Sequence, residues 1–536
     1  MKKQVLSIAI LFCCLTIVAQ SKKELFSVNK KPVSVSEFKR VYEKNLGLVV
    51  DEDSKNIDKY LDLYINYKLK VNEAYSLGLD TVRAYKRELE GYKKQLIAPY
   101  LQDQESINKM VKEAYSRIKN EVKASHILVR LPKKATSADT LKAYNKIIEI
   151  RNRVVSGESF AKVAREMSED PSAQFNGGNL GYFSAFKMVY PFEDNAYKTD
   201  LQGVSNPFKT RFGYHILKVT GKRESKGEFE VAHILARDRS IVGKAKIDSL
   251  YKKIKKGESF EEIAQKYSED VGTAQLGGKL PKFGTGKMVE DFEVNVLALK
   301  KINEVSKPFK TKFGWHIVKL LKTYPINSFD KMKVTIEKKV KSSDRLRVSQ
   351  KAVLDKLKKE YDISIYDKNF EIFTNKSIKE LSKMQLTHDN LLSINNKKIK
   401  QKAFFDYIRY RRKEDIGLLF EGFKNEEIFN YFKEDLVNKE PEYKYTLTEY
   451  KEGLLLFELM QQKIWKKSAN DSIGLQRFFN KTKGNYKQKK LEDIKGEVIS
   501  DYQKKLEDDW IKALRKNNVI RIRKRELKKL KQIYNQ

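Results

Sequence analysis

The chain has 536 residues, of which 40% are hydrophobic and 11% aromatic, with 109 lysines and arginines against 71 aspartates and glutamates. This length predicts three or four domains, and this composition excludes a mainly disordered chain. A net charge of +38 raises the question of nucleic-acid binding, but the lysines are spread along almost every expected helix and interleaved with acids. We therefore expect no nucleic-acid partner. The charge is expected to attract acidic unfolded chains or an anionic membrane surface, or only to solvate the surface.

The first residues are typical of an export signal. Two lysines precede an apolar run over 5–18, and Ala19 is a suitable last residue before a cleavage site. Since this run is short for a bilayer-spanning helix, we predict a cleaved signal peptide over 1–19, with a retained membrane anchor as the alternative. Both cysteines, Cys13 and Cys14, lie in this segment. The processed chain is therefore expected to lack disulfides and cysteine metal sites, and to be soluble beyond the inner membrane.

Residues 20–118 are predicted to be mainly helical after a short hairpin. Residues 25–35 indicate two short strands around an AsnLysLys turn, and Ser36 is expected to cap the first helix. Apolar residues then recur with the period of an amphipathic helix. The helices expected in this way cover 57–78, about 81–98 and 103–119.

Four of the five histidines lie at matching places in a block that occurs twice. The first block starts with HisIleLeuVal at His126 and closes with HisIleLeuLys at His215. The second starts with HisIleLeuAla at His233 and closes with HisIleValLys at His316. GlyGluSerPhe, SerGluAsp and a GlyGly pair occur between the histidines in the same order both times. This shared order establishes an internal duplication.

Each block predicts an α+β unit of about 100 residues with the element order β-α-α-α-β and small extra strands. In the first block a strand with alternating apolar residues covers 122–131, and a helix follows over 137–155. In the second block the corresponding strand covers 229–236 and the helix 242–256. A short helix then leads into SerGluAsp, and another lies near PheGlu in each block.

A fainter repeat links the two ends of the chain. The segment 391–399 and the helix expected after it resemble residues 25–42, and 357–365 resembles 514–522. Each member of the second pair reads as a helix leading into a short strand. We interpret 325–536 as one or two helical modules of the N-terminal type, with a coincidence of common helix patterns as the alternative.

The ordered motifs HisIleLeuVal, SerGluAsp, GlyGlyAsnLeuGlyTyrPhe and ThrArgPheGlyTyrHisIleLeu resemble parvulin-type (rotamase) peptidyl-prolyl cis-trans isomerases. The whole order of segments is similar to that of SurA-like periplasmic chaperones, and 452–460 looks like the longer parvulin-domain proteins of Bacteroidetes. The resemblance implies a multidomain fold, with two tandem α+β parvulin domains flanked by mainly α-helical chaperone regions. The implied domains are a signal peptide over 1–19, an N-terminal chaperone region over 20–118, parvulin domains over 119–223 and 227–322, and a C-terminal region over 325–536, with a duplicated chaperone module as one interpretation.

The resemblance also implies a role in a substrate groove for each residue that matches the family's pattern. Two histidines face each other in its floor, a carboxylate supplies its polar side, apolar residues hold the proline ring, and a threonine lies beneath the histidines. The implied catalytic residues are His126, Asp170, His215, His233, Asp270 and His316. The implied substrate-binding residues are Leu180, Met188, Phe192, Thr210, Leu280, Met288, Phe292 and Thr311.

The implied reaction is rotation about X–Pro bonds, which faces a barrier of roughly 18–20 kcal/mol because resonance flattens the amide. No bond is broken, so we expect no cofactor and no metal. Met and Phe at helical spacing are expected to line an apolar cup. The implied function is a periplasmic isomerase and chaperone for unfolded exported proteins, outer-membrane proteins above all. In the second block, Lys279 and Pro281 depart from the family's GlyGlyAspLeuGly pattern, which puts its rim in doubt.

Two alternatives stay open. The blocks could bind extended peptide without catalysis, as in a periplasmic holdase, or dock partners in an envelope adaptor. Each motif also has another interpretation taken alone: paired histidines can be hydrogen-bonded core groups, Met and Phe can be core residues, and GlyGly pairs can only make turns.

Overall fold

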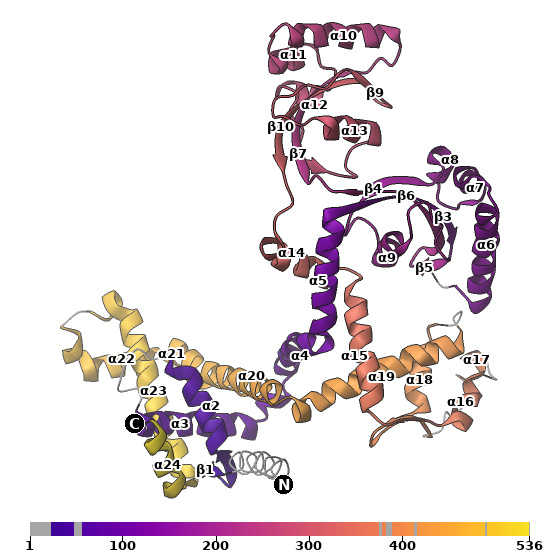
Figure 1. Cartoon of the computed structure of the whole chain (residues 1–536). Coiled ribbons are helices and arrows are strands. Elements are labelled where there is room, and N and C mark those ends of the chain that lie inside the picture. Colours follow the sequence, from indigo (N-terminus) through magenta and orange to yellow (C-terminus); the bar gives the residue numbers. More distant parts are fainter. Residues whose placement is uncertain are drawn as a thin grey trace, which may run out of the picture. The chain divides into compact units, whose positions relative to one another are not determined.

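The computed structural model describes most of the chain as two compact units. One unit is formed by the described residues within 1–99 and 435–536, and the other by those within 100–434 (Figure 1). The predicted signal peptide with both cysteines lies outside the described residues. In the part of the chain that is described, no helix is long and apolar enough for a bilayer crossing. The described residues are 23–47, 56–133, 135–374, 378–381, 389–411, 415–487 and 490–534.

The sheet of the first unit joins the two ends of the chain. Strand β1 (Glu24–Val28) pairs on one side with β2 (Lys31–Ser34) and on the other with β14 (Ile520–Ile522), antiparallel in both cases. Asn29, in the turn after β1, has a φ of 50°, a left-handed conformation that asparagine tolerates. Its N–H donates to the Val519 carbonyl and its Oδ1 accepts the Val519 N–H. The backbone and side chain of one residue thus tie the hairpin to the C-terminal strand.

The helix after the hairpin begins one residue earlier than expected. The cap of α2 (Val35–Leu46) is Ser34, whose hydroxyl accepts the Glu37 N–H. The expectation of Ser36 as the cap was therefore wrong. Serine serves at this place because its oxygen satisfies one of the N–H groups that have no partner inside the helix.

The long helices of the first unit close its core with apolar stripes. In α3, Leu61, Ile65 and Leu69 recur at helical spacing and pack with Phe26 of the sheet and Leu514 of α23. The remaining helices of this unit are α3 (Ile57–Ser76), η2 (Leu79–Thr81), α4 (Arg83–Ile97), α20 (Pro441–Met460), η4 (Gln461–Trp465), α21 (Lys466–Asn470), α22 (Ser472–Thr482), η5 (Lys483–Tyr486), η6 (Leu491–Ile494), α23 (Lys495–Asn517) and α24 (Lys524–Tyr534).

Each repeated block folds around a four-stranded antiparallel sheet. The strand orders are β4-β3-β6-β5 and β8-β7-β10-β9, so the two sheets have the same topology. The expected multidomain fold, with two α+β blocks flanked by helices, is confirmed. The strands are β3 (Asn120–Arg130), β4 (Asn179–Phe183), β5 (Phe208–Thr210), β6 (Gly213–Glu224), β7 (Glu228–Ala236), β8 (Phe283–Gly284), β9 (Phe309–Thr311) and β10 (Gly314–Tyr324).

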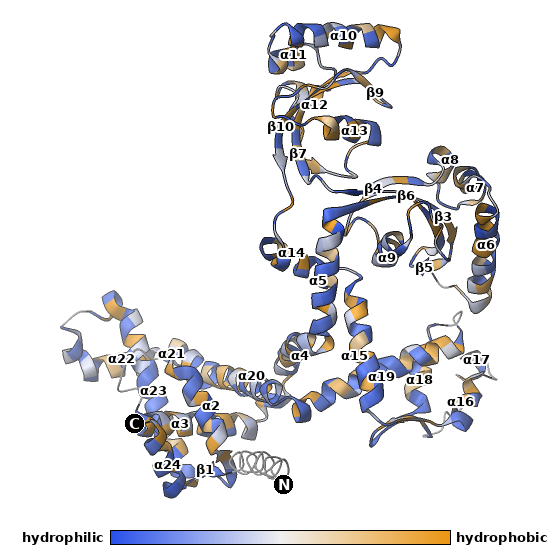
Figure 2. Ribbon diagram, in the orientation of Figure 1, coloured by the Kyte–Doolittle hydropathy of each residue, from blue (hydrophilic) through white to orange (hydrophobic). Residues whose placement is uncertain are grey.

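Helices cover both faces of each sheet. In the first block Ile127 and Ile216 pack against α6 and α7, whereas Leu217 lies on the opposite face with Phe192 of α9. Figure 2 shows hydrophobic and hydrophilic residues side by side on α6 and α10, as expected for helices with one buried face. The helices are α6 (Ser137–Val155), α7 (Phe160–Met167), α8 (Ala173–Asn176), α9 (Tyr190–Lys198), α10 (Ile241–Lys255), α11 (Phe260–Tyr267), α12 (Val271–Ala274) and α13 (Glu290–Ala298).

Three helices that lie outside the two repeated blocks pack beside the first block. η3 (Ala98–Leu101) precedes α5 (Gln104–Lys119), which packs along α14 (Phe329–Lys341) and touches the start of α15 (Leu346–Glu360). Apolar residues of α5 and α14 meet Ala185 of the first block in one core. The segments before and after the two blocks are thus joined next to the first.

The second unit contains a further three-stranded sheet that resembles that of the first unit. Its order is β11 (Ile363–Ile365), β12 (Asn390–Ile394), β13 (Lys397–Lys400), all antiparallel. Asn395 follows β12 with a φ of 48°. Its N–H donates to the Asp362 carbonyl and its Oδ1 accepts the Asp362 N–H. This repeats the pair of hydrogen bonds that Asn29 makes in the first unit.

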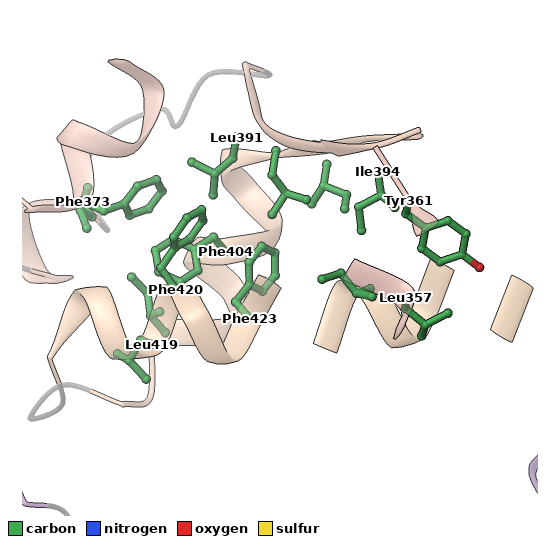
Figure 3. Packing of buried hydrophobic residues seen from close by; sticks show 14 of the residues in the cluster. Leu357, Tyr361, Phe373, Leu391, Ile394, Phe404, Leu419, Phe420 and Phe423 are labelled. Carbon is green, nitrogen blue, oxygen red and sulfur yellow. The ribbon is translucent and has the colours of Figure 1, made fainter. Parts of the chain in front are cut away.

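Aromatic side chains fill the core beneath this sheet (Figure 3). The Phe404 ring lies 5.3 Å from that of Phe420 and 5.2 Å from that of Phe423, between centroids. Such contacts between rings add to the burial of apolar surface. The helices of this part are α16 (Asp367–Thr374), α17 (Ile378–Leu381), α18 (Gln401–Ile408) and α19 (Ile416–Lys439).

Candidate active site

Strand register brings the two histidines of the first block together. His126 of β3 lies opposite Leu217 of β6, and His215 lies opposite Leu128. Because side chains alternate between the faces of a sheet, this register puts both histidines on one face, diagonal to each other. Their rings are 18° from parallel, with centroids 5.6 Å apart.

A chain of hydrogen bonds runs through this pair. His126 Nε2 lies 2.6 Å from Asp170 Oδ2, and His126 Nδ1 lies 3.4 Å from His215 Nδ1. His215 Nε2 lies 2.8 Å from Thr210 Oγ1, which also accepts the Phe212 N–H. A threonine hydroxyl has one proton and two acceptor lone pairs, so it can donate to His215 Nε2 while it accepts the Phe212 N–H.

Burial decides which of these groups is charged. It lowers the pKa of His126, and together with the neighbouring ring it lowers the pKa of His215 to about 3. Burial opposes ionisation of Asp170, but the Ser172 N–H and the His126 ring donate to its carboxylate and its pKa is lowered. At neutral pH both imidazoles are neutral beside a charged carboxylate. His126 therefore donates from Nε2, and His215 donates from Nδ1.

The second block repeats the arrangement and adds a hydroxyl. His233 Nε2 lies 2.7 Å from Asp270 Oδ2, and His316 Nε2 lies 2.8 Å from Thr311 Oγ1. Thr273 donates to the same Asp270 oxygen at 2.7 Å. The two histidine rings are 5.7 Å apart. Burial lowers the pKa of His233 and lowers that of His316 to about 4.

The two pairs of histidines differ at Nδ1. In the second block neither Nδ1 has a hydrogen-bond partner among the described residues, whereas in the first the two Nδ1 atoms face each other at 3.4 Å. The tautomers of the second pair are therefore set by the carboxylate and the threonine alone.

In each block, apolar side chains form a wall next to the histidines and the carboxylate, which together form the polar floor of the site. In the first block the Phe192 ring meets both histidine rings edge-on, at 5.5 and 5.6 Å, and Leu180 and Met188 pack beside it. In the second block all seven candidate residues line one cavity of about 250 Å³. They are His233, Asp270, Leu280, Met288, Phe292, Thr311 and His316.

The methionines of the wall are not on the helices that carry the phenylalanines. Met188 lies in the turn before α9, which begins at Tyr190, and Met288 lies in the turn before α13, which begins at Glu290. The methionines therefore reach the wall from a turn, although their spacing from the phenylalanines is that of a helix. Each wall is built from a turn and the helix that follows it.

The GlyGly pairs bring a strand close to the first histidine of each block. Gly178 has a φ of 78°, its carbonyl accepts the His126 N–H at 2.9 Å, and a Cβ there would lie 2.2 Å from the His126 oxygen. Gly278 has the same clearance to His233. The second glycine of each pair is thus required by close backbone approach as well as by the turn.

Two stretches of the chain, residues 106–223 and 234–322, match models of the PPIC-type PPIASE domain. The chain therefore carries two parvulin domains, and the resemblance to parvulins seen in the sequence is confirmed for these two stretches.

Several named proteins are similar in sequence to the parvulin region of this chain. The chain is 32% identical over 213 residues to the Chaperone SurA of Pseudomonas fluorescens, covering 38% of this chain and 50% of that protein. It is 38% identical over 179 residues to the Foldase protein PrsA of a Geobacillus species, covering 32% and 58%. The chain thus spans about half the length of the curated relatives it matches. The solved parvulin NmPin of Nitrosopumilus maritimus is 41% identical, with 19% of this chain and 97% of that chain covered and a TM-score of 0.16.

Sequence reasoning missed one ring in each parvulin domain. Phe208 stacks on His215 at 5.5 Å, and Phe309 stacks on His316 at 5.5 Å. Both belong to a ProPheLysThr motif that occurs once in each domain, so the repeat offered a signal. Thr273 was also missed, and its counterpart in the first domain is Ala173, so the repeat gave no signal there.

The departures of the second parvulin domain lie away from its polar floor. Lys279 forms an ion pair with Glu230, whose carboxylate also accepts the Tyr324 hydroxyl at 2.8 Å. Lys279 therefore places its charge on the strand beside it. Within the described ranges, no three His, Cys, Asp or Glu side chains gather as a metal-binding group would.

Proposed function

We propose that this chain is a peptidyl-prolyl cis-trans isomerase and chaperone that assists the folding of exported proteins in the periplasm, outer-membrane proteins among them. The observation that carries this proposal is the presence, in both parvulin domains, of a complete set of two neutral histidines, one carboxylate and an edge-on phenylalanine. Two domains of an isomerase family, each with an intact site, favour catalysis over peptide binding alone.

The site suits rotation about an X–Pro bond. The planar amide owes its barrier to resonance, and the twisted form has lost that resonance. In our proposal the apolar wall takes up the proline ring and excludes water from the amide. The fixed carboxylate and neutral imidazoles then present an ordered field to the twisted amide, with no reorganisation during the reaction. His126, Asp170 and His215, with their second-domain counterparts, are the proposed catalytic groups.

The test is exchange NMR on a capped Ala-Leu-Pro-Ala peptide with the full chain. We expect the wild type to accelerate cis–trans exchange, and the Asp170→Ala and Asp270→Ala variants to identify each site's share. The double variant should lose at least tenfold of the acceleration, while Asp200→Ala, an exposed carboxylate, should lose none. A double variant with the wild-type rate would show that the carboxylates are not catalytic. No acceleration by the wild type would favour a non-catalytic holdase or adaptor.

A cavity in the first unit supports the chaperone part of the proposal. It measures about 560 Å³, and its lining combines aromatic rings with charged groups of both signs. Leu63, in that lining, is 61% exposed. We expect Leu63→Ser to weaken suppression of aggregation of an unfolded outer-membrane protein, and Val82→Ser, 45% exposed elsewhere, to have no effect. Equal suppression by both variants would remove this cavity from the proposal.

The periplasmic location rests on the predicted signal peptide over 1–19. Intact mass measurement of the chain recovered from the cell envelope tests it. We expect a mature N-terminus after Ala19, and a full-length mass in the membrane fraction would support the retained anchor.

A further inference from the structure

In the first block, the residue after Phe192 holds a buried charge whose partners lie outside residues 119–223. Glu193 is fully buried in α9. Its Oε1 accepts a hydrogen bond from Arg117 of α5 at 3.1 Å and another from Arg345, which lies directly before α15. Arg345 is only 1% exposed. A buried carboxylate of this kind is stable only while its cations stay in place.

The same outside segment binds the start of α9 and the turn before it. The Tyr190 N–H, at the first position of α9, donates to the carboxylate of Asp344 at 3.1 Å, and Val189 offers no side-chain cap. The Arg345 guanidinium lies 4.2 Å from the centre of the Phe186 ring. The Phe186 N–H in turn donates to Glu193 Oε2 at 2.8 Å. The turn that carries Met188 is thus fixed at both ends.

In the second domain, the corresponding buried carboxylate is hydrogen-bonded by groups of its own domain. Glu293 stands at the position of Glu193, and its Oε1 accepts the N–H groups of Gly286, Lys287 and Met288 at 2.8–3.1 Å. No ion pair to Glu293 is found among the described residues. Gly286 takes a φ of 79° where the first domain has Phe186 at 66°. The hydrogen bonds to the buried carboxylate of the second site therefore come from its own domain, while Lys123 of the first block forms an ion pair with Glu290 at the start of α13.

We propose that Arg345, together with Asp344 and Arg117, is a set of positioning residues through which α5, α14 and α15 hold the apolar wall of the first isomerase site. This inference rests on the proposed function of that site. It makes the proline-binding wall of the first domain dependent on the helices that precede and follow the two blocks, whereas the buried Glu293 carboxylate of the second domain is hydrogen-bonded by N–H groups of its own domain. It also means that a fragment cut at 119–223 lacks both arginines and leaves Glu193 buried without a cation.

The test uses the full chain with ¹³C-methyl methionine, because Met188 and Met288 report on one site each. In the variant Arg345→Gln, we expect the Met188 methyl signal to shift and broaden and the Met288 signal to stay unchanged. Titration with the capped Ala-Leu-Pro-Ala peptide should show a five- to tenfold weaker affinity at Met188 and an unchanged affinity at Met288. Catalysis at saturating peptide should change less than twofold, since the polar floor is untouched.

Matched variants separate positioning from general destabilisation. Arg347→Gln removes the same charge two residues away, at an exposed position, and should change neither signal. Arg345→Lys keeps the cation and should restore most of the Met188 affinity. An unchanged Met188 signal and affinity in Arg345→Gln would overturn the inference, as would equal changes at Met188 and Met288. A wild-type chain in which the peptide moves neither methyl would instead count against the proposed function, while the peptide-free Met188 signal would still test the positioning.

Discussion

At neutral pH each site holds one charged carboxylate against two uncharged imidazoles. The histidines are buried to 4–7% exposure, and that burial makes an imidazolium costly. The carboxylate stays charged because N–H and O–H groups donate to it. The sites are therefore ordered dipoles around a single charge, which suits a reaction that transfers no proton.

This charge state predicts an acid limit to stability. Histidine in an unfolded chain has a pKa of about 6.5, whereas the pKa is about 3 for His215 and about 4 for His316 in the fold. Between these values the unfolded chain binds more protons, so the free energy of unfolding falls as the pH drops below 6.5, by up to about 1.4 kcal/mol per pH unit and histidine. Above pH 6.5 these histidines are neutral in both the folded and the unfolded chain, so the free energy of unfolding no longer depends on pH through them.

Urea denaturation at pH 7.5, 6.0 and 5.0 measures this effect. We expect the midpoint to be nearly constant above pH 6.5 and to move to lower urea at pH 6.0 and 5.0. Isomerase activity of the folded chain should change little between pH 6.5 and 8, because no site histidine titrates there. A constant midpoint down to pH 5.0 would contradict the neutral, buried state of the pairs.

Backbone approach at a single glycine gives a second prediction at this scale. In Gly178→Ala, the new Cβ would lie 2.2 Å from the His126 oxygen in a left-handed conformation. The strand must move, and we expect a loss of about 2 kcal/mol or more in stability together with loss of the first site's activity. Gly91→Ala is the control, since its helical position has open space and alanine favours helix. Thermal unfolding of both variants decides, and equal melting temperatures would refute the close approach.

Among the elements, two three-stranded sheets are built alike although one joins the ends of the chain and the other lies within it. In each, a helix leads into an edge strand that pairs with the first strand of a hairpin. An asparagine exchanges two hydrogen bonds with the residue directly before the edge strand. These matching bonds support the proposal that the C-terminal region contains a second copy of the N-terminal module.

That proposal predicts matching sensitivities. Asn395→Ala removes the side-chain acceptor and replaces a residue that tolerates a φ of 48° by one that does not, so we expect it to cost about 1–2 kcal/mol. Asn29→Ala should cost a similar amount. Asn395→Gly restores the backbone freedom but not the acceptor, and it should lose less. Urea denaturation measures the stability lost in each variant, and hydrogen exchange at 346–411 and at 24–46 locates the loss. An Asn395→Ala variant as stable as the wild type would contradict a structural role shared by the two asparagines.

The sequence predicted the parvulin elements well because their signals are local and occur twice. The helix over 137–155 and the strand around His126 lie within two residues of their expected bounds. Other features depend on contacts between distant residues, which no local pattern reveals. The pairing of Glu193 with Arg345, 152 residues away, leaves no periodic trace. The same holds for the turn position of Met188, where spacing alone indicated a helix.

For the molecule as a whole, the charge of +38 is the property that the two sites do not use. Their cups are apolar and each floor carries one carboxylate. We therefore expect the charge to act on the binding of clients or of anionic membrane surfaces, and not on isomerisation. Exposed charges act over a Debye length of about 10 Å at 0.1 M salt and about 3 Å at 1 M, so salt separates the two activities.

Raising NaCl from 0.05 to 0.5 M should weaken binding of an acidic unfolded client by at least tenfold, because attraction to a cationic surface is screened. A client of near-neutral charge should lose less than threefold, and exchange of the uncharged Ala-Leu-Pro-Ala peptide should change less than twofold. Fluorescence anisotropy of labelled clients and exchange NMR measure the two effects on the same preparation. Equal salt dependence of both clients would show that the lysines only solvate the surface. A parallel loss of isomerisation would mean that surface charge also guides peptides into the sites.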